Sequence, residues 1–172
     1  MITRSHIKGD APSIAVYSDC ERFRYSLRRV WDADAPRVTF VMLNPSTATE
    51  VQNDPTIERC EQRARRLEFG GFCAVNIFAL RATDPRDMRA AADPEGPDNA
   101  AALRESAQWA DTVIAAWGVH GEHRNQGPQT AAQLRAEGYA LHHLGLTKAG
   151  HPRHPLYLPY SAQPVLWEQA RD

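Results

Sequence analysis

Long hydrophobic runs are missing from this sequence of 172 residues. No apolar stretch approaches the roughly 18 residues that a helix needs to cross a bilayer. The first residues, MITRSHIKGDAPS, contain no apolar core of the kind that an export signal requires. We therefore predict a cytoplasmic protein that has no membrane partner.

Cysteine is scarce, and its spacing excludes several classes of protein. The chain has 3 cysteines, Cys20, Cys60 and Cys73, and no C-x-x-C pair. This spacing argues against a disulfide framework, a zinc ribbon and an iron–sulfur cluster held by cysteines. We predict that these side chains act as small hydrophobic groups in a reduced protein.

An excess of positive charge is also missing. The formal net charge is −1, so the molecule as a whole has no electrostatic attraction to a polyanion, and any contact with nucleic acid must be local. Lys8 and Lys148 are the only lysines, and the other basic side chains are arginines. Arginine suits bidentate contacts with phosphate, although genomic base composition explains the same bias.

Apolar runs and turn signals predict an α/β protein. Residues 14–18 and 23–31 have the pattern of two strands in a hairpin, and Asp54 followed by Pro55 is a strong start signal for a helix that Gly70 and Gly71 end. Strands alternating with helices favour parallel pairing. The pattern predicts further strands at about 38–43, 72–79, 112–117 and 139–145, and further helices at about 98–109, 128–137 and 164–170.

These elements predict a three-layer α/β/α sandwich. We expect a four-stranded, mainly parallel central sheet, an N-terminal β-hairpin at about residues 14–31 and an α/β core at about residues 37–170. All of it is expected to form one domain over residues 1–172, because the chain is too short for two large cores.

Polar residues stand where the predicted strands end. Asn44 follows one strand, Asn76 a second and Trp117-Gly118 a third, and the carboxyl ends of parallel strands face one crevice. Asn44-Pro45-Ser46 is either a structural turn or a site where the amide holds water and Ser46 binds an anion. Asn76 either pairs with backbone or reads the edge of a base, and Trp117 either packs in the core or stacks on a ligand.

The last part of the chain concentrates cationic side chains. Two interpretations are open beside that of a merely solvated basic loop. A metal site is disfavoured by the spacing, which lacks H-E-x-x-H and a nearby carboxylate. In an anion-binding loop, His154 would donate to developing negative charge while Lys148 and Arg153 meet phosphate, and Arg81 would serve phosphate or a carboxylate such as Asp84. The segment contains His142, His143, Lys148, His151, Arg153 and His154.

Five sequence blocks carry a resemblance to a known family. They are LNPST, DPTIERC, VNIFALRAT, AWG and LGLTKAGHPRHPLYL. In this order, from about Phe23 to Trp167, they resemble the bacterial and phage family catalogued as domain of unknown function 1643.

The same blocks are similar, more distantly, to landmarks of the uracil-DNA glycosylase superfamily. That resemblance implies that Asn44 positions the hydrolytic water, that Asn76 recognises the base and that His154 donates to the departing base. The chain departs from the pattern at Met42-Leu43, which replaces a glycine-containing approach, and at HPLYLP, which lacks the usual Ser-Pro. Leu156 or Tyr157 would then have to serve as the apolar wedge.

We therefore predict a protein of the uracil-DNA glycosylase type that recognises a base, modified or not, in nucleic acid or in a nucleotide. Hydrolysis of the N-glycosidic bond without a metal or other cofactor is the expected reaction if it is an enzyme. The alternatives are a binding module without turnover and a metal-dependent hydrolase that uses the histidine-rich loop. The predicted residues are Asn44 and His154 for catalysis, Asn76, Trp117, Gly118 and Ser46 for the ligand, and Arg81, Lys148 and Arg153 for phosphate.

Overall fold

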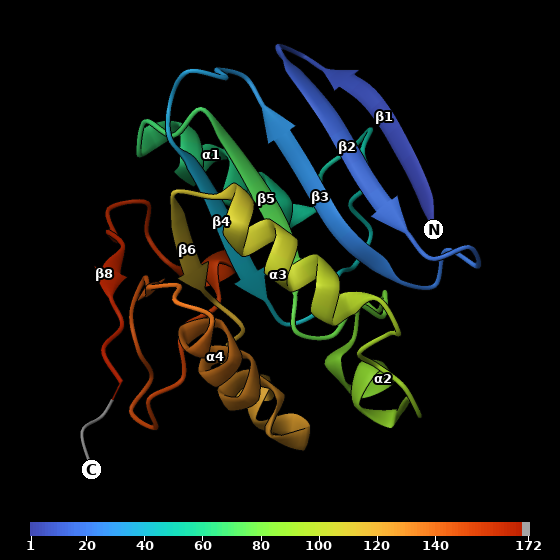
Figure 1. The fold of residues 1–172 in the computed structure, drawn as a ribbon, viewed down its shortest axis with the longest axis vertical. Coiled ribbons are helices and arrows are strands. Elements are labelled where there is room, and N and C mark those ends of the chain that lie inside the picture. The colour runs from blue at the N-terminus through green and yellow to red at the C-terminus, as the bar shows by residue number, and fades with distance from the viewer. Residues whose placement is uncertain (170–172) are drawn as a thin grey trace.

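One eight-stranded mixed sheet organises the protein, for which a computed structural model describes residues 1–169 (Figure 1). The strands lie in the order β1-β2-β3-β5-β4-β6-β7-β8. They are β1 (Ile2–Lys8), β2 (Ala11–Tyr17), β3 (Arg24–Val30), β4 (Arg37–Met42), β5 (Gly71–Asn76), β6 (Thr112–Ala115), β7 (Leu141–His143) and β8 (Val165–Leu166).

The predicted sheet is wrong in size and in strand direction, although the α/β class fits. Strand β4 pairs in parallel with β5 and β6, and β6 with β7, whereas the four remaining pairs are antiparallel. The predicted hairpin of residues 14–31 is not an addition to the sheet, because β3 pairs directly with β5 from Leu27 opposite Ala74 to Val30 opposite Gly71. The sheet is therefore mixed and mostly antiparallel, not four-stranded and mainly parallel.

Neither edge strand of the sheet is predicted as a strand from the sequence. Strand β1 is almost entirely exposed and polar, so it lacks the apolar alternation that identifies a strand. At the other edge, the predicted helix of residues 164–170 is wrong where the structure describes it. Val165 and Leu166 form β8, which pairs with β7, and Ala170 lies outside the described residues.

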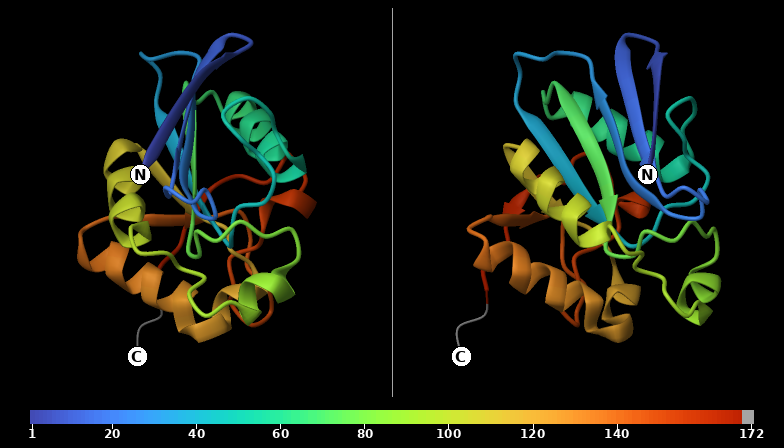
Figure 2. Two further views of the ribbon diagram at one scale, coloured as in Figure 1. Left: turned by 90° about the vertical axis from the view of Figure 1, so that its right-hand side faces the viewer. Right: turned by 45° about the vertical axis from the view of Figure 1, so that its right-hand side comes forward.

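Helices cover both faces of the sheet (Figure 2). One face is covered by α1 (Pro55–Arg66), which starts at the predicted N-cap Asp54, and the opposite face by α3 (Asn99–Trp109) and α4 (Gln126–Ala136). The short helix α2 (Pro85–Ala90) lies in the connection after β5. Two 3-10 turns complete the structure, η1 (Val119–Asn125) and η2 (Pro155–Tyr157).

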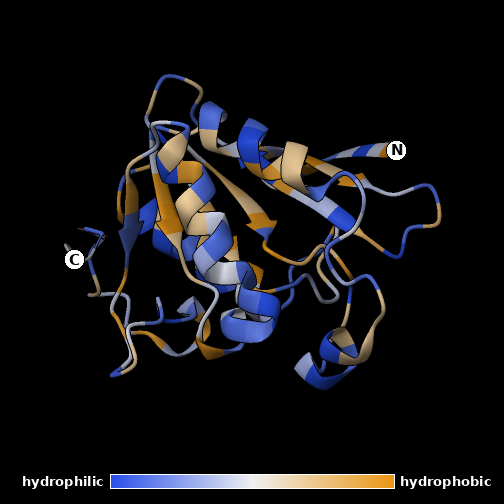
Figure 3. Cartoon of the chain, turned by 60° about the horizontal axis from the view of Figure 1, so that its bottom comes forward, coloured by the Kyte–Doolittle hydropathy of each residue, from blue (hydrophilic) through white to orange (hydrophobic). Residues whose placement is uncertain are grey.

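The core has two halves, one on each face of the sheet. Phe40 and Ile57 belong to the half beneath α1, and Val75 and Leu103 to the half beneath α3 and α4. Hydrophobic residues dominate the central strands, whereas the outward turns of the helices are hydrophilic (Figure 3). Within the described residues, no helix is long and apolar enough to span a membrane.

Gly70 is required for space rather than for ending a helix. Helix α1 already ends at Arg66 with Leu67 as its C-cap, whereas Gly70 lies against the loop before β4. Its amide donates to the carbonyl of Pro36 at 2.7 Å, and a Cβ at this position would overlap the carbonyl oxygen of Asp32.

We therefore expect Gly70→Ala to lower the free energy of unfolding by about 3 kcal/mol or more, because backbone atoms must move to admit a methyl group. Gly138→Ala is the control, since a Cβ at Gly138 meets open space and only its left-handed backbone resists the change, at a cost of about 1–2 kcal/mol. Urea unfolding measures both variants. A smaller loss for Gly70→Ala than for Gly138→Ala would contradict the steric argument.

Candidate functional site at the strand ends

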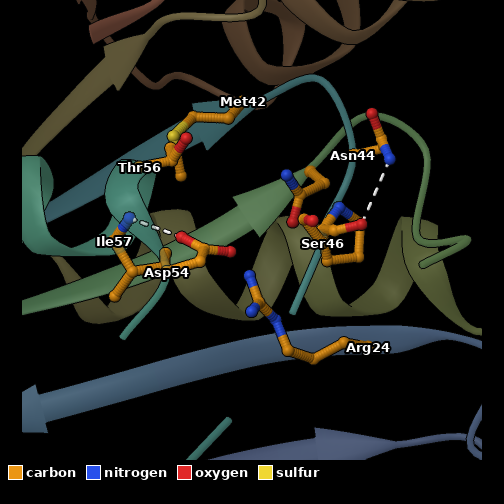
Figure 4. Close-up of a pocket in the computed structure, with 9 residues that line it drawn as sticks. Arg24, Met42, Asn44, Ser46, Asp54, Thr56 and Ile57 are labelled. Carbon is orange, nitrogen blue, oxygen red and sulfur yellow. Dashed lines mark hydrogen bonds between the residues drawn. The ribbon is translucent and has the colours of Figure 1, made fainter. Parts of the chain in front are cut away.

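A small cavity opens where β4 and β5 end and α1 begins (Figure 4). Its free space is about 20 Å³, which is room for about one water molecule. Residues from five different segments meet there, as expected at the carboxyl ends of neighbouring parallel strands. The lining consists of Arg24, Met42, Asn44, Pro45, Ser46, Asp54, Thr56, Ile57 and Asn76.

Asp54 is the carboxylate of this cavity. As the N-cap of α1, it accepts a hydrogen bond from the amide of Ile57 at 2.9 Å (Figure 4). Its other oxygen accepts one from the amide of Ala48 at 3.1 Å. Pro55 at the first helical position suits this geometry because it has no N–H to satisfy. The helix start therefore fixes a buried negative charge beside the cavity.

Arg24 brings a buried positive charge from β3. Its guanidinium points toward the carboxylate of Asp54 (Figure 4), and Nη1 donates to the carbonyl of Ala48 at 3.0 Å. Its Nε is buried and has no hydrogen-bond partner within the described part of the chain. Burial lowers the pKa of Arg24 to about 10 despite the opposing effect of Asp54, so the side chain remains a cation at neutral pH.

Asn76 is the last residue of β5 and lines the cavity. The side chain is 1% exposed, and its Oδ1 is buried with no partner among residues 1–169. An unsatisfied buried acceptor costs roughly 1–3 kcal/mol. A water molecule or a ligand group that donates a hydrogen bond in the cavity would remove this cost.

Asn44 and Ser46 join the exit of β4 to the segment after β5. Asn44 Nδ2 donates to the carbonyl of Ala82 at 2.8 Å and lies near those of Pro45 at 3.1 Å and Leu80 at 3.4 Å. These contacts fix the amide orientation, because carbonyls only accept, and Asn44 Oδ1 points away from the charged groups (Figure 4). Ser46 Oγ lies 3.0 Å from Thr83 Oγ1.

His154 lies at the start of η2, close enough to Asp54 for the carboxylate to affect its titration. Burial lowers the pKa of His154 to about 4, and the charge of Asp54 opposes this shift. Nδ1 accepts a hydrogen bond from the amide of Leu156 at 3.3 Å, so the neutral ring carries its proton on Nε2. At neutral pH His154 is therefore a hydrogen-bond donor without a positive charge.

Gly118 brings the end of β6 against His154. It has a left-handed backbone with φ 72°, and its amide donates to the carbonyl of Pro152 at 2.8 Å. A Cβ built on Gly118 would lie 3.6 Å from the Cβ of His154. The third predicted strand end therefore contacts the predicted catalytic histidine.

Trp117 points away from this junction and packs in the core. It is 2% exposed, and its ring lies against Gly121 and Gly127, where a Cβ on either glycine would overlap it. The ring of Trp167 is 5.7 Å away. Of the two interpretations of Trp117, the structure supports core packing.

The three residues predicted to bind phosphate have different neighbours. The guanidinium of Arg81 donates to the carbonyl of Glu21 at 3.3 Å and lies 5.4 Å from the ring centre of Tyr17. Lys148 is exposed in the turn between Thr147 and Gly150, and Arg153 is exposed beside Gly145. Their predicted role stays a prediction.

The described residues contain no group of three or more His, Cys, Asp and Glu side chains placed to hold a metal ion. Within the histidine-rich segment, the imidazole of His143 accepts from the amide of Gly145, and that of His151 lies 3.6 Å from Glu122. The imidazoles of His143, His151 and His154 thus contact different neighbours.

Two residues of the cavity were missed as site residues. The sequence identifies Asp54 only as the residue that starts a helix, and Arg24 only as part of the predicted strand of residues 23–31. The signal for Asp54 was present, because a helix start after a strand end is where a ligand-binding carboxylate is positioned. Arg24 had no such signal, since its burial depends on the loop of residues 44–54 folding over β3.

His154 should make stability depend on pH. Its pKa is 6.5 in the unfolded chain and about 4 in the fold, so the unfolded state binds more protons between these values. Neutral His154 therefore contributes up to roughly 3 kcal/mol to the free energy of unfolding. This contribution is complete above pH 6.5 and is lost as the pH falls toward 4. Urea unfolding at about pH 7.5 and about pH 5 should therefore show a smaller loss for His154→Gln than for the unchanged protein.

His6→Gln is the matched control, because His6 is exposed on β1. This variant should lose as much stability between the two pH values as the unchanged protein does. Equal losses for His154→Gln and His6→Gln would show that His154 is not held neutral by burial.

Comparison with known proteins assigns the chain to a family. A family model described as protein of unknown function (DUF1643) matches residues 24–156, which is more than half of the chain. Neither a curated protein nor a solved structure matches significantly. The matched region contains the cavity with Arg24 and Asp54, and His154. The chain therefore belongs to the DUF1643 family of proteins of unknown function.

Proposed function

We propose that this protein binds a nucleobase of a nucleotide or nucleic acid at the cavity beside Asn76, and that it hydrolyses the N-glycosidic bond of that nucleotide. The observation that carries the proposal is the buried Oδ1 of Asn76, which lines the cavity and lacks a partner within the described residues. An Asn amide offers a donor and an acceptor side by side, and a base edge presents the complementary pair.

The size of the cavity limits what enters it. Space for about one water molecule accommodates the polar edge of a base, with the rest of the ring at the mouth. A base in a duplex must leave the stack to reach such a position, at a cost of a few kcal/mol that is least for a mismatched or damaged pair. This favours a modified or unpaired base as the target.

The charged groups suit cleavage of an N-glycosidic bond. Water bonds to the sugar carbon while the carbon–nitrogen bond breaks and its electron pair leaves with the base, so positive charge develops on the sugar and negative charge on the base. The Nε2–H of His154 and the cation of Arg24 stabilise the departing base. The carboxylate of Asp54 accepts a hydrogen bond from the water and faces the developing sugar cation. The proton that the water loses on bonding to the sugar carbon ends on the departing base, which leaves a sugar hydroxyl and a neutral base.

This assignment changes the predicted role of Asn44. Its amide nitrogen is committed to backbone carbonyls and its oxygen points away from Asp54, so Asp54 is the better acceptor for the water. The resemblance to landmarks of the uracil-DNA glycosylase superfamily supports the roles of Asn76 and His154, as a likeness of sequence blocks.

A binding module without turnover is the second candidate. One observation favours it: both carboxylate oxygens of Asp54 already accept a backbone hydrogen bond, so fewer of their lone pairs are free to accept from a water molecule. Both candidates use the same cavity, and they differ only in whether the bond is broken.

Asn76→Ala tests the binding site common to both candidates. Loss of the amide should weaken binding of oligonucleotides that carry the recognised base by roughly 10- to 100-fold, in line with the 1–3 kcal/mol of a bidentate base contact. The panel contains uracil, hypoxanthine and hypermodified pyrimidines, and fluorescence anisotropy measures affinity. Thr39→Val is the control, because it removes a buried hydroxyl of β4 that donates to Ser106. Equal affinities for both variants across the panel would refute the proposed base site.

His154→Ala separates the enzyme from the binder. An enzyme should lose about 10²- to 10³-fold in the rate of abasic-site formation while keeping most of its affinity, since one donor to the leaving group is removed. The rate with intact His154 should stay flat between about pH 6 and 8, because a neutral donor does not titrate there. No release of base from any oligonucleotide or free nucleoside in the panel would leave only the binding module.

A further inference from the structure

A second, basic depression lies at the same end of the sheet as the cavity. It has a volume of about 310 Å³ and is lined by Arg86, Arg89, Ala90 and His123. Helix α2 follows the end of β5, and η1 follows the end of β6, so the depression is built from segments that leave the two strands on either side of β4 (Figure 1). Three of its four lining residues carry nitrogen donors.

Arg124 adds a further cation near His123. Its Nη2 donates to the carbonyls of Ala91 at 3.1 Å and Ala92 at 3.2 Å, which hold the guanidinium at the end of α2. Arg86 is already paired with Asp84 at 2.8 Å, whereas Arg89 is exposed. The nearby charges of Arg89 and Arg124 add to the effect of burial in lowering the pKa of His123, so these three side chains lie close together.

The backbone that carries this cluster is strained. Arg124 (φ 55°) and Asn125 (φ 57°) are consecutive residues in the left-handed region, which is unusual for arginine. The left-handed conformation costs an ordinary residue such as arginine about 1–2 kcal/mol, whereas asparagine tolerates it, and such strain concentrates at ligand sites and switch regions. Helix α4 starts directly after these residues, and the side chain of its N-cap Asn125 accepts no hydrogen bond from the first-turn amides. The partial positive charge at the start of this helix is therefore not offset by Asn125.

Two contacts join the cluster to the base-binding cavity. The ring of His123 lies 5.7 Å from that of Phe78, and Gln126 Nε2 donates to the carbonyl of Ile77 at 3.2 Å. Ile77 and Phe78 directly follow Asn76 in the chain. In addition, the Nε2 of His123 is buried without a partner in the described part of the chain.

We infer that Arg89, His123 and Arg124 form a binding site for a phosphate group. Arginine presents a fork of donors that matches phosphate oxygens, and the imidazole supplies a further donor. The identity of the ligand rests on the proposed function: the phosphate belongs to the nucleotide or strand whose base is held at Asn76. The site then supplies the local attraction to a polyanion that the net charge of −1 does not provide.

The test uses a phosphate polymer without bases. A fluorescent strand made only of tetrahydrofuran abasic residues is titrated with the full chain at several salt concentrations. Arg89→Gln should weaken binding about tenfold, as expected for loss of one charged hydrogen bond. It should also reduce the slope of log K against log salt by about 0.7, the value for one phosphate contact on a single strand.

Two further variants control for position and for folding. Arg104→Gln removes an exposed arginine of α3 that is paired with Glu137 at 3.1 Å, and it should change neither affinity nor slope. Arg124→Asn removes the guanidinium but introduces a residue type that tolerates the left-handed backbone. It should therefore weaken binding of the abasic strand as Arg89→Gln does, while its circular dichroism spectrum stays unchanged. An unchanged slope in both Arg89→Gln and Arg124→Asn overturns the site.

The outcomes also separate this site from the base-binding cavity. Inorganic phosphate is titrated in parallel. If Arg89→Gln weakens binding of inorganic phosphate but leaves the salt slope of the abasic strand unchanged, the site binds free phosphate and its link to nucleic acid is overturned. If Arg89→Gln lowers the slope but Asn76→Ala has no effect on the base panel, the phosphate site stands and the proposed base recognition fails. If Asn76→Ala weakens binding to the base panel but Arg89→Gln leaves the salt slope unchanged, the base site stands and the phosphate site is overturned.

Discussion

The candidate site depends on the buried carboxylate of Asp54. A buried charge needs hydrogen bonds or an opposite charge nearby, and Asp54 accepts from the amides of Ala48 and Ile57 while the guanidinium of Arg24 points toward it. These contacts start α1 and hold the loop after β4 over β3. They also place the negative charge of Asp54 where it acts on His154. Removal of the carboxylate would leave Arg24 as an uncompensated buried cation.

The helix that Asp54 starts also holds the loop that carries His154. The guanidinium of Arg63 is fully buried and donates to the carbonyls of Leu158 at 3.2 Å and Pro159 at 3.0 Å. The ring of Tyr160 is covered by the guanidinium groups of Arg59 at 4.0 Å and Arg66 at 3.9 Å. One helix thus positions the carboxylate at its first turn and, through its arginines, the segment that follows His154.

The sequence predicts these junctions better than it predicts the sheet. Asn44, Asn76 and Gly118 stand where apolar runs end, and a strand end is a local signal that survives any error in topology. Strand β1 is polar because it is an edge strand, so periodicity could not identify it. The placement of β3 beside β5 is a long-range pairing that the alternation within β3 does not encode. Trp117 lies beside Gly118, but the side of the sheet to which its ring points depends on register.

The interpretation of Asn76 as a ligand-binding residue rests on its neighbour Asn99, which already binds the backbone at the end of β5. Asn99 donates through Nδ2 to the carbonyl of Asn76 at 2.7 Å and lies 3.3 Å from that of Ile77, where the backbone leaves the sheet. Both amides leave a buried Oδ1 without a partner in the described residues, but of the two it is Asn76 that lines the cavity. An amide kept only to satisfy backbone at this strand end would duplicate Asn99. A polar side chain at Asn76, in a strand where valine or isoleucine would be less costly, is therefore better explained by a group that enters the cavity.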